Sequence, residues 1–138
     1  MKYTKEEILA KCAAMCKNTL METLAIEFID FTEDTVTARM PVNSRVHQPD
    51  GVLHGGASVA LAESVASAGA FVFLGEKDIA IRGIEIAANH IRSVKEGFVF
   101  ANASILHKGR TTQLWQIKIT NEAGELVSIA KLTTLTLR

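Results

Sequence analysis

This sequence contains few cysteines and has no net charge. The 138 residues include two cysteines, and 15 basic side chains are balanced by 15 acidic ones. A chain without an excess of Lys and Arg is a poor nucleic-acid binder, because that excess is what neutralises a phosphate backbone. Cys12 and Cys16 lie four residues apart on an expected helix face. We therefore predict free thiols rather than a disulfide framework.

The beginning of the chain also lacks the apolar stretch of a secretory signal, since residues 1–7 are mostly polar. Hydrophobic residues make up 48% of the chain and charged residues 22%, which excludes intrinsic disorder. There is no linker, internal repeat or low-complexity segment. We expect a single domain over residues 1–138, located in the cytoplasm.

One long apolar run extends from Ala57 to Leu74, and its polar residues are Ser58, Glu63, Ser64 and Ser67. A bilayer-spanning helix needs about 20 strongly apolar residues, and a carboxylate at its centre costs roughly 2.5 to 3.5 kcal/mol. Small residues dominate this run rather than Leu and Ile. We therefore predict a helix buried inside a soluble fold, and no membrane partner.

Hydrophobic periodicity predicts the elements before this run. Thr4 and Glu7 have capping-box spacing, which favours a helix over residues 4–20. Alternating side chains predict strands over residues 24–28 and 36–42. A turn-rich loop over residues 43–56 follows.

The chain after the run reads as four strands. Two are expected over residues 79–92 and 98–106, a third where Trp115, Ile117 and Ile119 alternate, and a fourth after a turn at 121–124. One face of the fourth strand is formed by Val127, Ile129, Leu135 and Leu137. A curved antiparallel sheet wrapped around the apolar helix would bury it on most sides, and the open flank would need a partner. The sequence predicts an α+β fold and a dimer.

Glu63 is the first candidate for chemistry, because a carboxylate inside an apolar helix is costly to bury unless it is paired or protonated. Ser67 lies four residues on and shares its helix face, so its hydroxyl could orient the Glu63 carboxylate or a water. The alternative is a structural Glu63, paired with an Arg or facing solvent.

The loop before the helix offers the complementary groups. Gly55 and Gly56 begin the helix, where backbone N–H groups have no partner and the dipole favours negative charge. Gln48 and His54 add donors, and together these groups could polarise a carbonyl and hold an oxyanion. The alternative is a tight strand-to-helix turn with incidental polar residues.

Other chemistry finds less support in the sequence. The four His residues share no metal-ligand spacing, and no nucleophile elbow, P-loop or dinucleotide fingerprint is present. The segment 107–112 places two cations, a Gly and two hydroxyls between strands, which suits a phosphate. His90, Arg92 and Ser93 end another strand and could join such a site. The alternative for both groups is solvated loop charge.

Four segments of the sequence resemble the hotdog-fold acyl-CoA thioesterases. They are Gln48 to Ser58 with its His-Gly-Gly, Ala62-Glu63-Ser64, Ala88 to Ser93, and Leu114 to Ile117. The phenylacetate-pathway type and the 1,4-dihydroxy-2-naphthoyl-CoA thioesterases resemble it most. The resemblance covers nearly the whole chain and is specific for the fold and the thioesterase chemistry, but not for the acyl group.

The resemblance implies a hotdog fold, a homodimer that pairs into a tetramer, and no metal or organic cofactor. It assigns Glu63 as nucleophile or general base, Gln48 and His54 to carbonyl polarisation, and the Gly55 N–H to the oxyanion hole. It also implies contacts with CoA at Gly83, His90, Arg92, Ser93, His107, Lys108, Gly109, Arg110 and Thr111. Lys108 and Arg110 depart from the distribution of basic residues in relatives.

The leading interpretation is hydrolysis of an acyl-CoA thioester with an aromatic or medium acyl group. The alternatives are a hotdog hydratase or dehydratase acting on an acyl thioester, and a non-catalytic acyl-CoA binding module. Phe71, Phe73, Val65, Ala68 and Val72 could wall an acyl pocket, but core packing explains most of them as well. Helix geometry separates His54 from Glu63 by about 13 Å and roughly 180°. We therefore expect an active site shared between two subunits.

Overall fold

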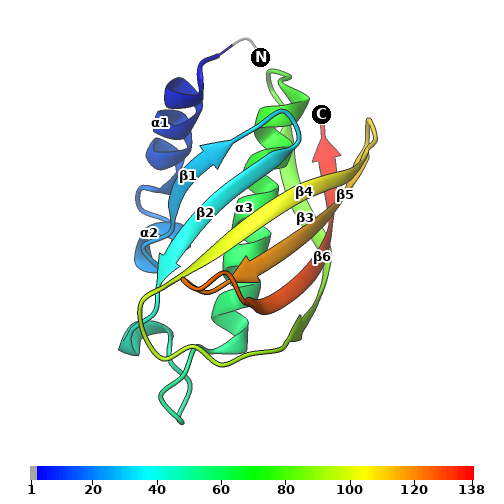
Figure 1. The fold of residues 1–138 in the computed structure, drawn as a ribbon. Coiled ribbons are helices and arrows are strands. Elements are labelled where there is room, and N and C mark those ends of the chain that lie inside the picture. The colour runs from blue at the N-terminus through cyan, green and yellow to red at the C-terminus, as the bar shows by residue number, and fades with distance from the viewer. Residues whose placement is uncertain (1–2) are drawn as a thin grey trace.

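Residues 3–138 are described by a computed structural model of the chain. Met1 and Lys2, the first residues of the polar segment from which no secretory signal is expected, lie outside the described residues. The elements, drawn in Figure 1, are α1 (Lys5–Cys16), α2 (Leu20–Thr23), β1 (Glu27–Phe31), β2 (Thr35–Pro41), the 3-10 turn η1 (Ser44–Val46), α3 (Gly55–Leu74), β3 (Ala80–His90), β4 (Phe98–Lys108), β5 (Thr112–Thr120) and β6 (Leu126–Leu137).

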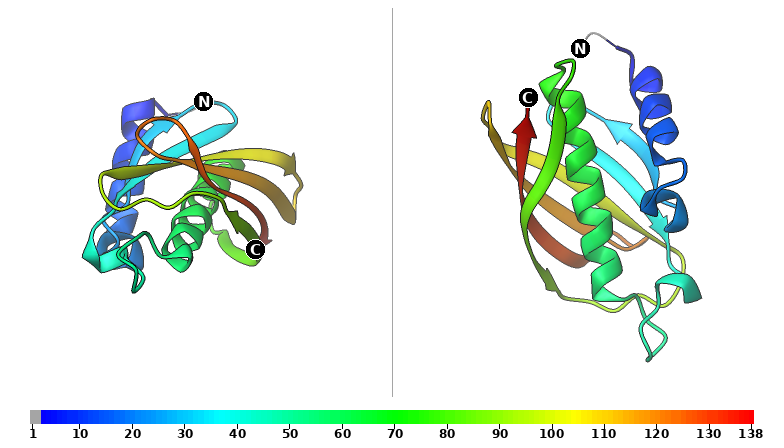
Figure 2. Two further views of the ribbon diagram at one scale, coloured as in Figure 1. Left: turned by 60° about the horizontal axis from the view of Figure 1, so that its bottom comes forward. Right: turned by 180° about the vertical axis from the view of Figure 1, so that it is seen from behind.

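The six strands form one sheet in the order β1-β2-β4-β5-β6-β3, and every neighbouring pair is antiparallel. Figure 2 shows that the sheet curves around α3, while the opposite side of this helix stays uncovered by strands. The predicted α+β architecture, an antiparallel sheet wrapped around an apolar helix, is confirmed. Strand β3 is an edge strand, so one side of its backbone has no neighbour in the sheet.

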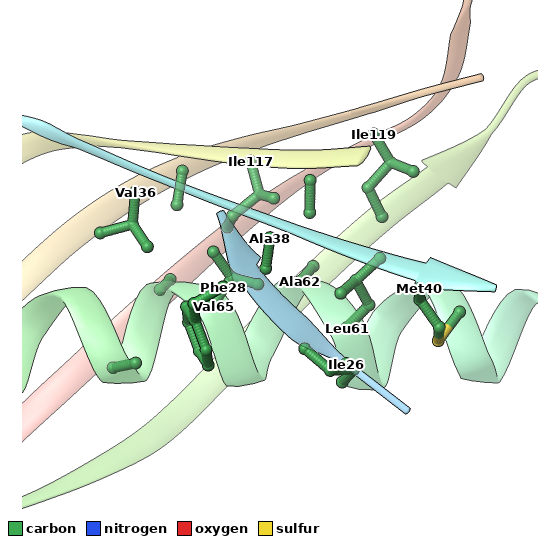
Figure 3. Packing of buried hydrophobic residues seen from close by; sticks show 14 of the residues in the cluster. Ile26, Phe28, Val36, Ala38, Met40, Leu61, Ala62, Val65, Ile117 and Ile119 are labelled. Carbon is green, nitrogen blue, oxygen red and sulfur yellow. The ribbon is translucent and has the colours of Figure 1, made fainter. Parts of the chain in front are cut away.

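The core lies between α3 and the sheet (Figure 3). On α3, Leu61, Ala62 and Val65 are fully buried, and the sheet contributes buried side chains such as Val36 and Ile117. By length and composition alone α3 could cross a membrane. In the fold it is instead the core helix, as the sequence analysis predicted.

The N-terminal helix is shorter than predicted. Thr4 and Glu7 do form a capping box, with both backbone-to-side-chain hydrogen bonds in place at 3.0 and 3.1 Å. The helix ends at Cys16 rather than Leu20, because Asn18 adopts a left-handed conformation (φ 62°) and the Thr19 side chain caps a second helix. The predicted strand over residues 24–28 also begins late, at Glu27, since Leu24 still closes α2.

Beyond Val127, the face of β6 formed by Ile129, Leu135 and Leu137 is not the buried face of the strand. Ile129 and Leu135 are only half-buried and Leu137 is exposed, so they lie on the outer face of the sheet. The buried side chains that face α3 are Ser128, Ala130, Leu132, Thr134 and Thr136. The hydroxyls of Thr134 and Thr136 are buried because each has a hydrogen-bond partner inside the sheet.

Candidate active site

Glu63 lies in the middle of α3 on the side that the sheet leaves open. It is half-buried and borders a cavity of about 740 Å³ between α3, the α1–α2 junction and the beginning of β3. The cavity wall is largely apolar and includes Met15, Leu20, Val59 and Phe71. The arrangement presents one carboxylate to a pocket that suits an apolar group.

The carboxylate of Glu63 lies directly against the backbone of Gly83 on β3. A Cβ atom added at Gly83 would come within 2.5 Å of Glu63 Oε2 and 3.0 Å of its Cδ. The register of β3 against β6 shifts between Gly83 and Glu85, which marks a bulge at this point. Gly83, which the resemblance assigns to CoA, thus lies beside the proposed catalytic group within one subunit.

Ser67 borders the same cavity one helical turn beyond Glu63. No hydrogen bond joins the two side chains among residues 3–138, so within one subunit Ser67 is available for a water or a substrate group. Ser64, also on this cavity, donates its hydroxyl to the Ala60 carbonyl at 2.7 Å and is therefore occupied.

A second cavity, of about 280 Å³, lies at the beginning of α3. Gln48, Gly55, His90, Arg92 and Ser93 all border it. The structure therefore brings together five of the predicted residues, from the loop before α3 and from the end of β3.

Two groups at this second cavity are free to donate hydrogen bonds. The side-chain oxygen of Gln48 accepts from the Asp50 N–H, which leaves the Gln48 amide NH₂ without a partner inside the loop. The Gly55 N–H, in the first turn of α3, makes no hydrogen bond within the described residues. An amide NH₂ and a helix-terminal N–H are suitable donors for a carbonyl oxygen that becomes negative.

The two neighbouring His residues are held in defined orientations. His54 Nδ1 accepts from the Gly56 N–H at 2.8 Å, so the proton of a neutral His54 ring is on Nε2. His90 Nδ1 lies 2.7 Å from Ser128 Oγ, and its ring packs against Gly55 so closely that an added Cβ there would be 2.8 Å from His90 Nε2. Gly55 is thus required by the close approach of His90.

The carboxylate and the donors are separated within one subunit. Glu63 borders the first cavity, whereas Gln48 and Gly55 border the second. Helix α3 begins at Gly55, and nine residues from His54 to Glu63 correspond to about 13 Å along the axis. No single subunit places these groups around one carbonyl.

The predicted phosphate loop, His107 to Thr111, joins β4 to β5 at the other end of the sheet from His90 (Figure 1). Strand β4 has 11 residues, which corresponds to roughly 35 Å. Of the cations involved, Arg92 pairs with Glu125 at 3.4 Å, while Lys108 and Arg110 are exposed. The two groups of predicted CoA contacts therefore lie apart within one subunit.

Sequence reasoning missed part of the first cavity. Of the proposed acyl-pocket residues, Ala68 and Phe71 border it, whereas Val65 is buried in the core and Phe73 stacks on Trp115. The wall contributed by Met15, Thr19, Leu20 and Met21 was not predicted. No sequence signal identifies it, because it arises from the break between α1 and α2.

The cysteines offer no competing nucleophile. Both are free and buried, and burial raises the pKa of the Cys12 thiol to about 11 and also raises that of Cys16. A thiol with so high a pKa stays protonated near neutral pH. Among residues 3–138 no three His, Cys, Asp or Glu side chains gather where they could hold a metal ion.

Gly83→Ala is expected to lower kcat by roughly 10- to 100-fold, because the new methyl group would displace the Glu63 carboxylate. A misplacement of a catalytic group by about 1 Å lowers the rate by up to roughly 100-fold. The backbone at Gly83 does not have a positive φ, so alanine is tolerated there and folding should survive. Steady-state kinetics and thermal unfolding of the purified variant measure both effects.

A double-mutant cycle tests whether Gly83 acts through Glu63. In a Glu63→Gln background, Gly83→Ala should lower the residual kcat no further. An equal, independent loss in both backgrounds would show that Gly83 contributes in another way.

Comparison with known proteins identifies the family of this chain. Residues 50–128 match the family model of the thioesterase superfamily. The chain is 44% identical over 135 residues to the 1,4-dihydroxy-2-naphthoyl-CoA hydrolase of Escherichia coli strain K12, covering 97% of this chain and 98% of that protein. It is 38% identical over 134 residues to the proofreading thioesterase EntH of Cronobacter turicensis, covering 97% of each.

Solved structures show the same relationship. The crystal structure of a mutant thioesterase from Pseudomonas aeruginosa superposes with a TM-score of 0.90 at 40% identity, covering 94% of this chain and 93% of that one. A thioesterase from Haemophilus influenzae gives a TM-score of 0.89 at 40% identity, covering 99% and 92%. From these matches in sequence and in structure it follows that this chain belongs to the thioesterase superfamily and is a hotdog-fold thioester hydrolase.

Proposed function

We propose that this protein hydrolyses acyl-CoA thioesters with Glu63 as its catalytic carboxylate. The observation that carries the proposal is the placement of Glu63: half-buried on the core helix, held against Gly83 and open to an apolar cavity. The names of its relatives, which include a naphthoyl-CoA hydrolase, support CoA as the thiol component. The acyl group is aromatic or of medium length, in keeping with the apolar cavity.

The reaction consumes one water and releases a carboxylic acid and the CoA thiol. Glu63 either attacks the carbonyl carbon, expelling the thiolate and forming a mixed anhydride that water cleaves, or removes a proton from the attacking water. The Gly55 N–H, the Gln48 amide and His54 Nε2–H hold the carbonyl oxygen as it becomes negative. Ser67 orients the water or Glu63. Incorporation of oxygen isotope into Glu63 in a single turnover separates the two mechanisms.

The active site is completed by a second copy of the chain. Edge strand β3 can pair with the β3 of a second subunit, since one side of its backbone is unpaired in the sheet and Ile84 on it is 55% exposed. The exposed side of α3 would then face its counterpart. A two-fold axis between antiparallel helices brings Glu63 of one subunit to the donors at Gly55 of the other.

In this dimer, binding of the CoA nucleotide falls to the loop 107–111 and Gly83 of one subunit, with His90, Arg92 and Ser93 of the other subunit at the remaining contacts. Lys108 and Arg110 supply exposed positive charge there, and the N–H groups of Arg110 and Thr111 donate no hydrogen bond within the described residues. These are the groups that bind phosphate oxygens.

The dimers pair into tetramers in the cytoplasm. The outer face of the sheet carries half-buried Leu114, Ile129 and Leu135 and exposed Leu137, an apolar surface that a second dimer would cover. Nucleic acids and membranes are not partners, consistent with the balanced charge of the chain and with the packing of its apolar helix against the sheet.

A panel of thioesters tests the proposal. Thiol release is measured for benzoyl-, phenylacetyl-, hexanoyl- and acetyl-CoA, and for the pantetheine thioester of the best acyl group. We expect the highest kcat/KM for an aromatic or medium acyl-CoA, and a lower KM for the CoA thioester than for its pantetheine counterpart.

The same panel separates the alternatives. A binding module would bind acyl-CoA without turnover, and a hydratase or dehydratase would interconvert a 3-hydroxyacyl thioester and its unsaturated product. Either result, in the absence of thiol release, contradicts the proposal.

A further inference from the structure

A chain of buried polar side chains lies directly behind the loop 107–111. Gln113 on β5 and Thr134 on β6 face each other in the sheet register, and both side chains are fully buried. Trp115 and Thr136 flank them. Buried polar groups are costly unless every partner is satisfied, and no buried side-chain nitrogen or oxygen in the described residues lacks a hydrogen-bond partner.

The directions of these hydrogen bonds fix the Gln113 amide. Trp115 Nε1–H can only donate, and it donates to Thr134 Oγ1 at 3.2 Å. The Thr134 hydroxyl then donates to Gln113 Oε1 at 2.8 Å. The NH₂ group of Gln113 is therefore turned the other way, toward the loop.

On that side the Gln113 NH₂ donates to the Gly109 carbonyl at 2.9 Å and to Thr136 Oγ1 at 3.0 Å. Gly109 belongs to the loop, so a side chain anchored in the core holds part of its backbone. The loop itself is tight at this position, because an added Cβ at Gly109 would clash with the Thr112 carbonyl.

The next two carbonyls of the loop are held in the same way. Arg138 Nη1 donates to the Arg110 carbonyl at 2.9 Å, and the Thr136 N–H donates to the Thr111 carbonyl at 2.8 Å. Arg138 is itself fixed by a two-pronged ion pair with Glu76, at 2.9 and 2.8 Å. All three successive carbonyls are thus engaged by the protein.

These hydrogen bonds to the loop carbonyls determine the direction of the loop N–H groups. In a planar trans peptide the N–H is opposite the carbonyl, so carbonyls tied inward turn the N–H groups of Arg110 and Thr111 away from their anchors. A loop fixed in this form pays less ordering entropy when it binds an anion.

We propose that Gln113 is a positioning residue for binding of the CoA nucleotide: by holding the Gly109 carbonyl it presets the loop, with N–H groups and cations facing the phosphates. The inference rests on the proposed function. It adds a fully buried residue, which touches no substrate, as a determinant of KM.

The experiment compares Gln113→Leu, which removes the amide at similar size, with Trp115→Phe. The latter breaks the far end of the same hydrogen-bonded chain and keeps the bond between Gln113 and Gly109. KM and kcat are measured for an acyl-CoA and for its acyl-pantetheine counterpart. Titration calorimetry with adenosine 3′,5′-bisphosphate and thermal unfolding complete the set, with Arg110→Ala as the variant that removes a direct phosphate contact.

Gln113→Leu should raise KM for the acyl-CoA about five- to tenfold and weaken bisphosphate binding by a similar factor. Its kcat and its KM for the pantetheine thioester should not change. Trp115→Phe should lower the melting temperature and leave all of these constants unaltered. If Gln113→Leu does not fold, Gln113→Met takes its place, since a flexible thioether fits the same space.

An equal rise in KM for the acyl-CoA and for the acyl-pantetheine would show that Gln113 has only a structural role. The same changes in KM and kcat in Trp115→Phe would show this too. Either result would overturn the inference. Failure of the proposed function looks different. In that case wild-type protein itself would not hydrolyse the acyl-CoA, or Arg110→Ala would leave its KM and bisphosphate binding unchanged.

Discussion

Glu63→Gln is expected to reduce kcat by 10²- to 10⁴-fold while the protein folds normally. Gln preserves the volume of the side chain and removes the negative charge that either an attacking nucleophile or a general base must carry. Glu63 accepts no hydrogen bond from the described residues of its own subunit, so the exchange breaks no internal pair. The measurement is the rate of thiol release at saturating acyl-CoA.

A matched control is Glu33→Gln, the same chemical change at an exposed position in the β1–β2 turn that borders neither cavity. It should retain wild-type kcat. If Glu63→Gln retains more than about a tenth of the wild-type kcat, the activation free energy has risen by less than ~1.4 kcal/mol. That outcome would remove Glu63 from the catalytic role.

Mixing two inactive variants is expected to restore activity. Glu63→Ala lacks the carboxylate, and Gln48→Ala lacks a donor at the second cavity. In a dimer with shared sites, each mixed dimer has one intact site and one doubly damaged site. Random exchange makes about half of the dimers mixed, so roughly a quarter of wild-type activity should return for a two-fold interface of this kind.

Exchange of subunits is verified first, by native mass spectrometry of a mixture in which one variant carries a mass label. Each variant incubated alone under the same conditions provides the baseline. If verified mixed dimers stay at that baseline, each active site belongs to a single subunit, and the shared-site proposal is wrong.

Local signals predicted most of the fold. The capping box of Thr4 and Glu7 and the alternation around Val36 and Trp115 are determined by near neighbours, and the structure confirms them. The break at Asn18 was not predictable from helical periodicity, because it depends on a left-handed backbone and on the Thr19 cap.

The buried face of β6 could not be predicted from local sequence for a different reason. Hydrophobic alternation favours Leu135 inside, yet Thr134 is buried instead, since Gln113 and Trp115 on β5 supply hydrogen bonds to its hydroxyl. Such a pairing joins residues about 20 positions apart, and polarity alone places them at the surface.

The candidate site likewise has a part that local sequence predicts and a part that it does not. Glu63 was identifiable because a carboxylate is conspicuous in an apolar helix, and Gly55 because it begins that helix. The contact of Glu63 with Gly83 and the hold of Gln113 on Gly109 depend on the register of β3 and β5. No local pattern contains that register.

The two long sides of helix α3 differ in how well they tolerate substitutions. Leu61 and Val65 fill the core, where extra volume typically costs 1 to 3 kcal/mol and truncation about 2 to 5 kcal/mol. Val59 and Phe71 border an open cavity, and a change in their size alters its shape without that penalty. Mutation and selection can therefore reshape the pocket for a new acyl group along one side of the helix while the scaffold on the other side is inherited unchanged.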